Sequence, residues 1–277
     1  MRKRKLFLLL AAAVFLLCGC GKPKEPENPY RLKTQILEQY WESEIKTIRT
    51  EYIYDENGYL SELQTFDGDD WWYTRQFFLD EHGNNHGSEA NFADGTQAGE
   101  RALTLDDQGR MITSESYQNS QVNATTEYGY SGDGQITKLY INRIGALHEE
   151  DWKSFVDRTF DRKGRLTRED TRWEPDNNAS SYTLYHYEKD NLLRTETYKG
   201  EELDNYTDYI YSEEGLVQVA ITRQADGTLQ SKHVTIFDEY GNELEVVAYA
   251  YASELARFGQ TDEEPDSRTT YIYEIKE

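Results

Sequence analysis

The sequence predicts an all-β protein, an antiparallel meander of about 16–18 strands that curls into a spiral sheet or an open barrel. Three observations predict it. A four-residue turn pattern recurs about every 26 residues, apolar residues precede each turn at a spacing of two, and 22 tyrosines occur among the 277 residues. This aromatic content excludes wholesale disorder, because disordered chains are poor in aromatic residues.

The chain begins with the features of an exported lipoprotein. Residues 2–5 are basic, and the apolar run 6–17 is shorter than the roughly 20 residues that a membrane span needs. Such a segment is typical of a secretory signal. The ending Leu17–Cys20 resembles a bacterial lipobox, with Gly19 before Cys20. We expect residues 1–19 to be removed and Cys20 to carry a lipid, on the outer face of the bacterial cytoplasmic membrane. The alternative is an ordinary signal peptide with incidental cysteines.

The composition of the mature chain restricts its cross-links and the classes of partner that it can bind. Residues 20–30 are rich in proline and charge and are expected to form a short tether to the lipid. No second cysteine remains, so a disulfide framework is excluded. Removal of four basic residues changes the net charge from −22 to −26. Such an anionic chain is a poor ligand for nucleic acid, which is bound by neutralising its phosphates.

Residues 31–277 are predicted to form a single repeat domain. Asp or Ser at the first position of a turn accepts a hydrogen bond from the turn backbone, and Gly, or Asn191, at the fourth can adopt the left-handed conformation that closes a hairpin. The turns are Asp55–Gly58, Asp80–Gly83, Asp106–Gly109, Ser131–Gly134, Asp161–Gly164, Glu188–Asn191, Ser212–Gly215 and Asp238–Gly241.

Each turn is flanked by residues that indicate strands. The residue before each turn is apolar or aromatic, and so is the residue two places earlier in most copies, as in Tyr52 and Tyr54. A spacing of two places both side chains on one face of a strand. An apolar residue follows soon after seven of the eight turns, and a second turn, such as Phe66–Gly68, separates successive copies. Each copy therefore contributes two strands, with aromatic and aliphatic side chains on the inner face of the curled sheet.

The ends of the repeat region fit the same pattern. Arg31–Tyr40 has a spacing that a helix could also explain, but its place one strand before the first turn favours a strand. Tyr271–Glu274 looks like the opening strand of a ninth copy. The only helix that we predict is Ala252–Phe258, inside an insertion before the last strand.

The Tyr/Phe-Asp-x-x-Gly-x-Leu pattern resembles the YD repeat of the RHS and teneurin class, from about Arg31 to the C-terminus. The resemblance implies a curled β-sheet that serves as a shell or an extracellular scaffold. Neither a C-terminal toxin domain nor an RHS-type core segment is recognisable. The chain therefore looks like a small, stand-alone repeat lipoprotein of a Gram-positive bacterium.

One aromatic cluster is a candidate ligand-binding surface. Trp71, Trp72 and Tyr73 lie together at a strand start, beside acidic residues. Exposed tryptophan and tyrosine rings stack on sugars and anchor protein interfaces. Packing inside the curled sheet is the alternative, and for the Trp residues near turns it is the one we favour. The same choice applies to Trp41, Trp152 and Trp173.

Metal sites are not expected. His82 and His86 are four residues apart, but Gly83 lies between them, so the helical spacing of zinc ligands does not apply. Asp67, Asp69 and Asp70 form the densest acidic group, which could suit calcium. Capping of the turns explains these aspartates without a metal. We expect no metal and no cofactor.

The motifs of several enzyme classes are missing from the sequence. It contains no Gly-x-Ser-x-Gly and no phosphate-binding Gly-Lys-Ser/Thr, and we identify no catalytic residue. We therefore expect a non-catalytic scaffold or adhesin-like module that binds a protein or a glycan at the cell surface. The alternative is an envelope-associated glycan hydrolase with two catalytic carboxylates. Among 52 acidic residues the sequence cannot single out such a pair.

Overall fold

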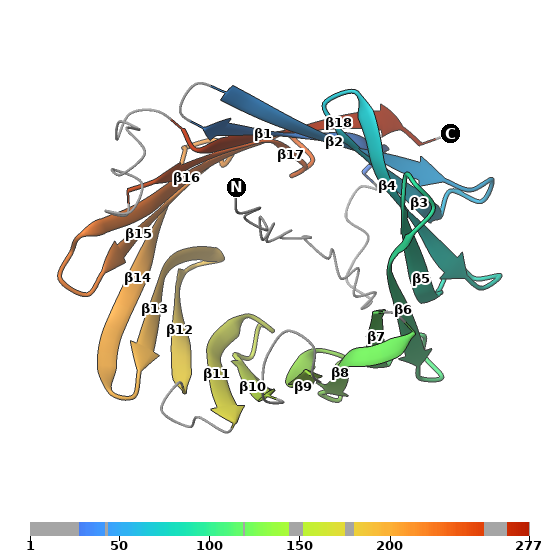
Figure 1. Ribbon diagram of the computed structural model, residues 1–277. Coiled ribbons are helices and arrows are strands. Elements are labelled where there is room, and N and C mark those ends of the chain that lie inside the picture. The colour runs from blue at the N-terminus through green and yellow to red at the C-terminus, as the bar shows by residue number, and fades with distance from the viewer. Residues whose placement is uncertain are drawn as a thin grey trace, which may run out of the picture.

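The computed structural model describes residues 28–41, 44–118, 120–143, 152–174, 180–251 and 265–276. In these ranges the chain forms one antiparallel sheet of 18 strands that closes into a barrel (Figure 1). The strands are β1 (Tyr30–Trp41), β2 (Glu44–Tyr54), β3 (Leu60–Asp67), β4 (Asp70–Leu79), β5 (Asn85–Phe92), β6 (Gln97–Leu105), β7 (Met111–Gln118), β8 (Gln121–Tyr130), β9 (Ile136–Arg143), β10 (Trp152–Phe160), β11 (Leu166–Glu174), β12 (Ser181–Glu188), β13 (Asn191–Lys199), β14 (Glu202–Tyr211), β15 (Val217–Gln224), β16 (Leu229–Phe237), β17 (Glu243–Ala250) and β18 (Ser267–Ile275).

This architecture confirms the all-β meander and its strand number. Each strand pairs with its neighbours in sequence, and the sequence-predicted strand at Arg31–Tyr40 is β1. The predicted helix Ala252–Phe258 lies outside the described residues. Over the described ranges, no helix is long and apolar enough to cross a membrane.

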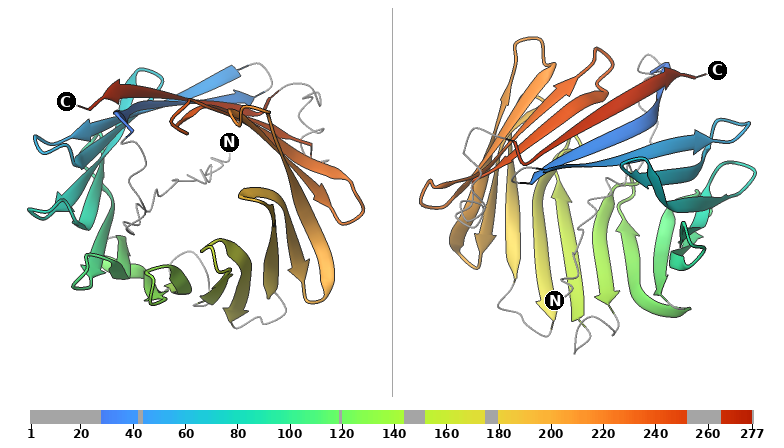
Figure 2. Two further views of the ribbon diagram at one scale, coloured as in Figure 1. Left: turned by 180° about the vertical axis from the view of Figure 1, so that it is seen from behind. Right: turned by 45° about the horizontal axis from the view of Figure 1, so that its top comes forward.

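The barrel closes because its first and last strands pair. β1 and β18 run antiparallel from Tyr30 opposite Ile275 to Gln39 opposite Ser267, with one irregularity between Leu32 and Thr34. The strands tilt relative to the barrel axis, and the hairpin turns project from both rims (Figure 2). Closure leaves no unpaired edge strand at the ends of the meander. An open sheet would have two such edges, and exposed edges can pair with other chains.

Most of the predicted turns form at one rim with a common hydrogen-bond pattern. In the turn after β6, the amide of Gly109 donates to the Asp106 carbonyl at 2.9 Å, and Gly109 has φ +75°. The Asp106 carboxylate accepts from the amides of Gln108 and Arg110, both at 2.9 Å. The same arrangement recurs in the turn at Asp161. The sequence pattern therefore identified both the capping carboxylate and the left-handed glycine.

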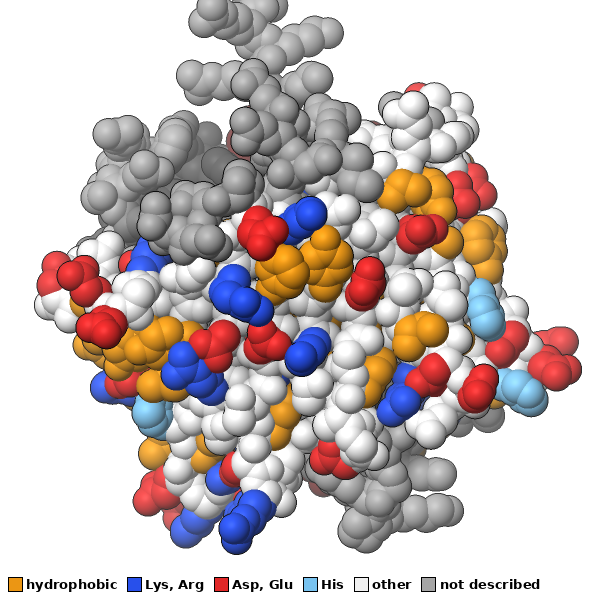
Figure 3. All heavy atoms as spheres, turned by 90° about the horizontal axis from the view of Figure 1, so that it is seen from below, with side chains coloured by type: hydrophobic (Ala, Val, Ile, Leu, Met, Phe, Trp, Pro, Cys, Tyr) orange, Lys and Arg blue, Asp and Glu red, His pale blue; other side chains and the backbone are white. Residues whose placement is uncertain are grey.

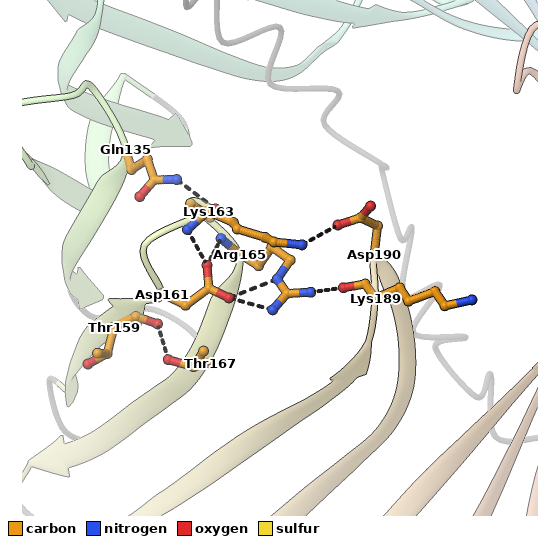
Figure 4. Close-up of polar contacts among 9 residues, drawn as sticks. Gln135, Thr159, Asp161, Lys163, Arg165, Thr167, Lys189 and Asp190 are labelled. Atoms are coloured by element: carbon orange, nitrogen blue, oxygen red, sulfur yellow. Dashed lines mark hydrogen bonds and ion pairs between the residues drawn. The ribbon is translucent and has the colours of Figure 1, made fainter.

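Successive turns also contact one another (Figure 4). Gln135 Nε2, from one turn, donates to the carbonyl of Gly164 in the next at 2.7 Å. Arg165 donates to Asp161 in its own turn and to the carbonyl of Lys189 in the following one. The guanidinium of Arg165 also lies over the ring of Tyr187, 4.6 Å from its centroid. These contacts connect neighbouring copies at this rim beyond the strand pairing.

The turn at Glu188–Asn191 differs from the prediction. Asn191 is the first residue of β13 and pairs with Glu188, so the connection has only two residues. The left-handed residue is Lys189, with φ +54°, and among the described non-glycine residues only Ser120 shares a positive φ. The prediction that Asn191 replaces the turn glycine is therefore wrong. A two-residue hairpin needs its positive φ inside the loop, and Asn191 lies beyond it.

Candidate functional site: the barrel lumen

Side chains along each strand alternate between the lumen and the outside. Ile53, Ile210 and Ile272 each lie between two tyrosines and are 36%, 55% and 44% exposed. Burial raises the pKa of flanking tyrosines such as Tyr52 and Tyr271. The tyrosines therefore face the enclosed side of the sheet and the isoleucines face outward.

The lumen is enclosed but accessible to water. Among the described residues, no large side chain is fully buried, and only Ile48, Ala90, Ile136 and Val247 form a buried apolar core. His233 lies on the lumen face, opposite Ala220 and Ala248, and is exposed, yet burial lowers its pKa. Both observations fit a side chain that is exposed to solvent inside the barrel. Barrels of about 16–18 strands are wide enough to hold water.

Four tyrosines at this end of the strands have a structural role. The hydroxyl of Tyr54 donates to the carbonyl of Leu32 at 2.7 Å, and that of Tyr130 donates to the carbonyl of Met111 at 2.6 Å. The hydroxyls of Tyr211 and Tyr273 make equivalent bonds, to Leu192 and Glu243. These phenols connect strands and have their donor occupied.

Three of the tyrosines two residues earlier have a different environment from Tyr52, which donates to Gln35 Oε1 at 3.0 Å, and Tyr271, which is hydrogen-bonded to Glu243. Tyr128, Tyr185 and Tyr209 face the lumen, and within the described part of the chain their hydroxyls have no hydrogen-bond partner. Burial, followed by the charge of Glu169, raises the pKa of Tyr185 to about 12. It therefore remains a neutral phenol at physiological pH, able both to donate and to accept a hydrogen bond.

Deeper in the lumen the wall consists of small side chains with hydroxyl groups. Cross-strand threonine pairs include Thr183 with Thr197, at 3.2 Å between the hydroxyl oxygens, and Thr207 with Thr222, at 2.9 Å. Thr65 lies in the same layer and is buried. This layer and the tyrosines above it offer hydroxyl groups that serve as donor or acceptor.

Charged groups on the lumen face are few. Glu169 accepts from Arg158 at 2.7 Å, and Asp67 pairs with Lys46 at 3.0 Å. Arg75 and Arg101 bond only to serine hydroxyls within the described part of the chain. The sequence reading missed both arginines, although each stands at a fixed distance from a predicted turn.

Charged side chains of both signs are scattered over the outer face (Figure 3), and several of them form ion pairs. Arg194 contacts Asp208 at 2.6 Å, and Arg168 contacts Asp170 at 2.6 Å. The guanidinium of Arg168 also covers the ring of Tyr182, which stacks on Tyr198 with centroids 4.7 Å apart. Acidic and basic side chains alternate with apolar ones over the face in view, as expected for a solvated surface with cross-strand pairs.

One shallow pocket of about 320 Å³ lies beside these stacked rings. It is lined by Asp157, Asp170, Thr171, Arg172, Ser180, Ser181, Tyr182 and Gly200. Asp157 is paired with Arg172 at 3.1 Å, and Asp170 is paired with Arg168. Arg168 and Tyr198 cover the two faces of the Tyr182 ring. The polar and aromatic groups that line the pocket therefore mostly contact one another.

The predicted aromatic cluster does not form a single surface. Trp71 is half exposed and pairs with outward-facing Phe66, whereas Tyr73 pairs with Thr65 on the lumen side. The bulge at Trp72 brings its ring edge-on to Tyr73, with centroids 5.3 Å apart. Trp71 is thus the most accessible ring of the three.

The other tryptophans are only partly described. Trp173 pairs with Ser154 on the lumen face and is half-buried. The side chains of Trp41 and Trp152, and Cys20, lie outside the described residues.

The described histidines and aspartates do not assemble a metal site. Within the described ranges, no three His, Cys, Asp or Glu side chains come together. His86 Nε2 lies 3.3 Å from the Asp80 carboxylate, and His82 is exposed. Asp55 accepts from the amides of Asn57 and Tyr59, the capping role that the sequence suggested.

Comparisons with known proteins give low similarity. No family model matches the chain, and no curated protein matches it. The solved structure of TcdB2-TccC3-Cdc42 gives a TM-score of 0.36 at 14% identity, covering 74% of this chain and 13% of that one. A porin-like protein from Bacteroides uniformis ATCC 8492 gives 0.44 at 12% identity, covering 88% and 96%. One from Bacteroides vulgatus ATCC 8482 gives 0.42 at 13% identity, covering 88% and 99%.

Proposed function

We propose that the chain is an exported, lipid-anchored YD-like repeat protein whose lumen binds a glycan without catalysis. The observation that carries this proposal is the set of lumen tyrosines with free hydroxyls, Tyr128, Tyr185 and Tyr209, above a layer of threonine and serine. Sugar hydroxyls both donate and accept, as these groups do, and sugar rings stack on aromatic faces. A largely neutral, hydroxyl-rich wall suits a glycan better than an apolar protein surface.

The carboxyl groups favour binding over hydrolysis. A glycosidase of the usual kind needs one carboxylic acid whose pKa is raised, so that it can protonate the leaving group. Among described carboxyl groups with a shifted pKa, every shift is downward, as for Asp170 beside Arg168 and Glu274 beside Arg31. In the lumen, Asp67 and Glu169 are engaged by cations, and Glu243 is hydrogen-bonded to Tyr271. The hydrolase remains the alternative, because it would act on the same class of ligand.

The binding experiment compares inward and outward tyrosines of one strand. Tyr209→Ala should abolish retention of the full chain on immobilised cell-wall glycans, and Tyr206→Ala should not, since Tyr206 faces outward beneath Arg194. Loss on Trp71→Ala with retention on Tyr209→Ala would place the site at the outer rim instead. Release of new reducing ends from the glycan would favour the hydrolase.

Lipid attachment needs its own test. We infer that Cys20 carries the lipid and that the protein stays on the outer face of the cytoplasmic membrane, since stable anchoring needs more than one acyl chain and a lipoprotein modification supplies it. Labelling of cells with a clickable fatty acid should mark the parent chain and not Cys20→Ala. Equal labelling of both would contradict the assignment.

A further inference from the structure

One lumen position differs in charge from copy to copy. In each copy it lies four residues before the residue that directly precedes the turn, as Thr50 does before Tyr54, and it faces the lumen. Across the nine copies it is occupied by Thr50, Arg75, Arg101, Thr126, Val156, Thr183, Thr207, His233 and Thr269. Threonine fits here in five copies, so the fold itself does not require a charge at this place.

The two arginines lie in adjacent copies and have similar contacts. Arg75 Nη1 donates to the Ser88 hydroxyl at 3.0 Å, and Arg101 Nε donates to the Ser114 hydroxyl at 2.7 Å. Ser88 and Ser114 are 3% and 2% exposed, so they lie beneath other groups. A guanidinium has several N–H donors, and each of these has committed only one to the protein.

The charges around this pair are segregated between the two faces of the sheet. From Tyr73 in β4 to Tyr130 in β8, the inward strand positions carry no carboxylate, and Arg75 and Arg101 are their only charges. The acids of these strands, Glu89, Glu100, Glu115 and Glu127, alternate onto the outward face. Neither arginine is within ion-pair distance of a carboxylate in the described ranges, although acidic residues far outnumber basic ones in the chain.

We propose that Arg75 and Arg101 form an anion site in the lumen, which binds acidic groups on the ligand. The proposal rests on the proposed function and specifies its ligand as a glycan with carboxylate or phosphate groups. Arginine binds such oxyanions through paired, charge-assisted hydrogen bonds, while the serines hold each guanidinium against the wall. Binding of an acidic ligand would supply the negative charge that these inward strand positions lack.

The test uses the full chain with oligogalacturonate and its neutral methyl ester as matched probes. Calorimetry at low ionic strength should show tighter binding of the acid form, weakened by added salt. Arg75→Gln and Arg101→Gln should each weaken binding of the acid form by about tenfold or more and leave the ester unchanged. Arg75→Lys, which keeps the charge, should lose less. Arg223→Gln, on the outer face beside Asp208, is the control and should bind as the parent.

The outcomes separate this proposal from the one on which it rests. Equal binding of acid and ester, unaffected by either arginine change, would overturn the anion site and leave glycan binding intact. Failure of the parent to bind either probe or immobilised cell-wall glycans would overturn both. Loss of binding of both probes in Arg75→Gln and Arg75→Lys alike would also contradict the proposal, because it would mean that Arg75 supports the lumen rather than an acidic ligand.

Discussion

Two walls of the lumen are built from the same repeat and offer different chemistry. The wall of β4 to β7, which we call the arginine wall, carries Arg75, Ser88, Arg101 and Ser114. The wall of β12, β14 and β18, the tyrosine wall, carries Tyr185, Tyr187, Tyr209, Tyr211, Tyr271 and Tyr273. Both walls have turns preceded by an apolar or aromatic residue, whereas the positions farther along the strand differ in charge and polarity. The repeat thus separates the residues that form the framework from those free to specify a ligand.

The largest expected difference between the walls appears at alkaline pH. Burial raises the pKa of Tyr185 and Tyr273 to about 12, and also raises that of Tyr271. An unfolded tyrosine loses its proton near pH 10, so between about 10 and 12 the unfolded state binds fewer protons than the native state. The stabilisation that these tyrosines contribute should therefore be fully present below pH 10, and the free energy of unfolding should fall as the pH rises toward 12.

Urea melts across this interval measure the effect. Tyr185→Phe removes one of the titrating groups and should make the decline shallower. Arginine keeps its charge throughout, so Arg75→Gln and Arg101→Gln should leave the slope unchanged. A parent protein whose unfolding free energy is level up to pH 12 would contradict the assignment of these tyrosines to an enclosed face.

The framework, unlike the walls, was accessible to sequence reasoning. A carboxylate that caps a turn and a glycine with positive φ leave fixed residue types at a fixed spacing, so the turns at Asp106 and Asp161 could be placed correctly. The alternation of Tyr52, Ile53 and Tyr54 likewise predicted which side chains share a face. These are local rules of the backbone, and the sequence carries them directly.

Other features depend on the whole sheet and could not be predicted. Closure requires that β1 meet β18, which depends on twist accumulated over all strands. The cluster Trp71 to Tyr73 looked continuous, but a bulge at Trp72 divides it between faces. The role that we propose for Arg75 depends on the assignment of the faces and on its having no acidic partner in the described ranges.

The next largest effect tests whether the two walls share one framework. Gly109 and Gly215, at the turns after β6 and β14, have φ of +75° and +74°. Valine at either position should cost about 1–3 kcal/mol of unfolding free energy through backbone strain. An added Cβ at Gly215 meets no atom within 4 Å, so its cost isolates the strain, while Gly109→Val also approaches Asn84 Oδ1 at 3.0 Å.

Gly99→Val in β6 is the control, since its φ is not positive and the nearest atom is 3.9 Å away. It should melt close to the parent. If both Gly109→Val and Gly215→Val were as stable as the parent, the two walls would not share a turn that needs a glycine with positive φ.

A smaller effect separates framework from ligand positions within one strand. The Tyr211 hydroxyl donates to the Leu192 carbonyl at 3.0 Å, whereas the Tyr209 hydroxyl has no partner in the described ranges. Tyr211→Phe should therefore cost about 1 kcal/mol of unfolding free energy, and Tyr209→Phe close to none. Conversely, glycan binding should weaken in Tyr209→Phe and persist in Tyr211→Phe. Equal stability losses would mean that both tyrosines belong to the framework.

The smallest effect concerns the turn at the start of the tyrosine wall, where a lysine takes the left-handed conformation. Lys189 has φ +54°, which costs a residue with a Cβ more than it costs glycine. Lys189→Gly should relieve this strain, offset in part by the entropy of glycine, for a net gain of about 0.5 kcal/mol. Asn191→Gly should act in the opposite direction by about 0.5 kcal/mol, because Asn191 opens β13 and glycine weakens a strand. Urea melts of the two variants decide between Lys189 and Asn191 as the left-handed residue. A gain from Asn191→Gly and a loss from Lys189→Gly would restore the four-residue turn that the sequence pattern predicts, and this copy would then match the turns of the arginine wall.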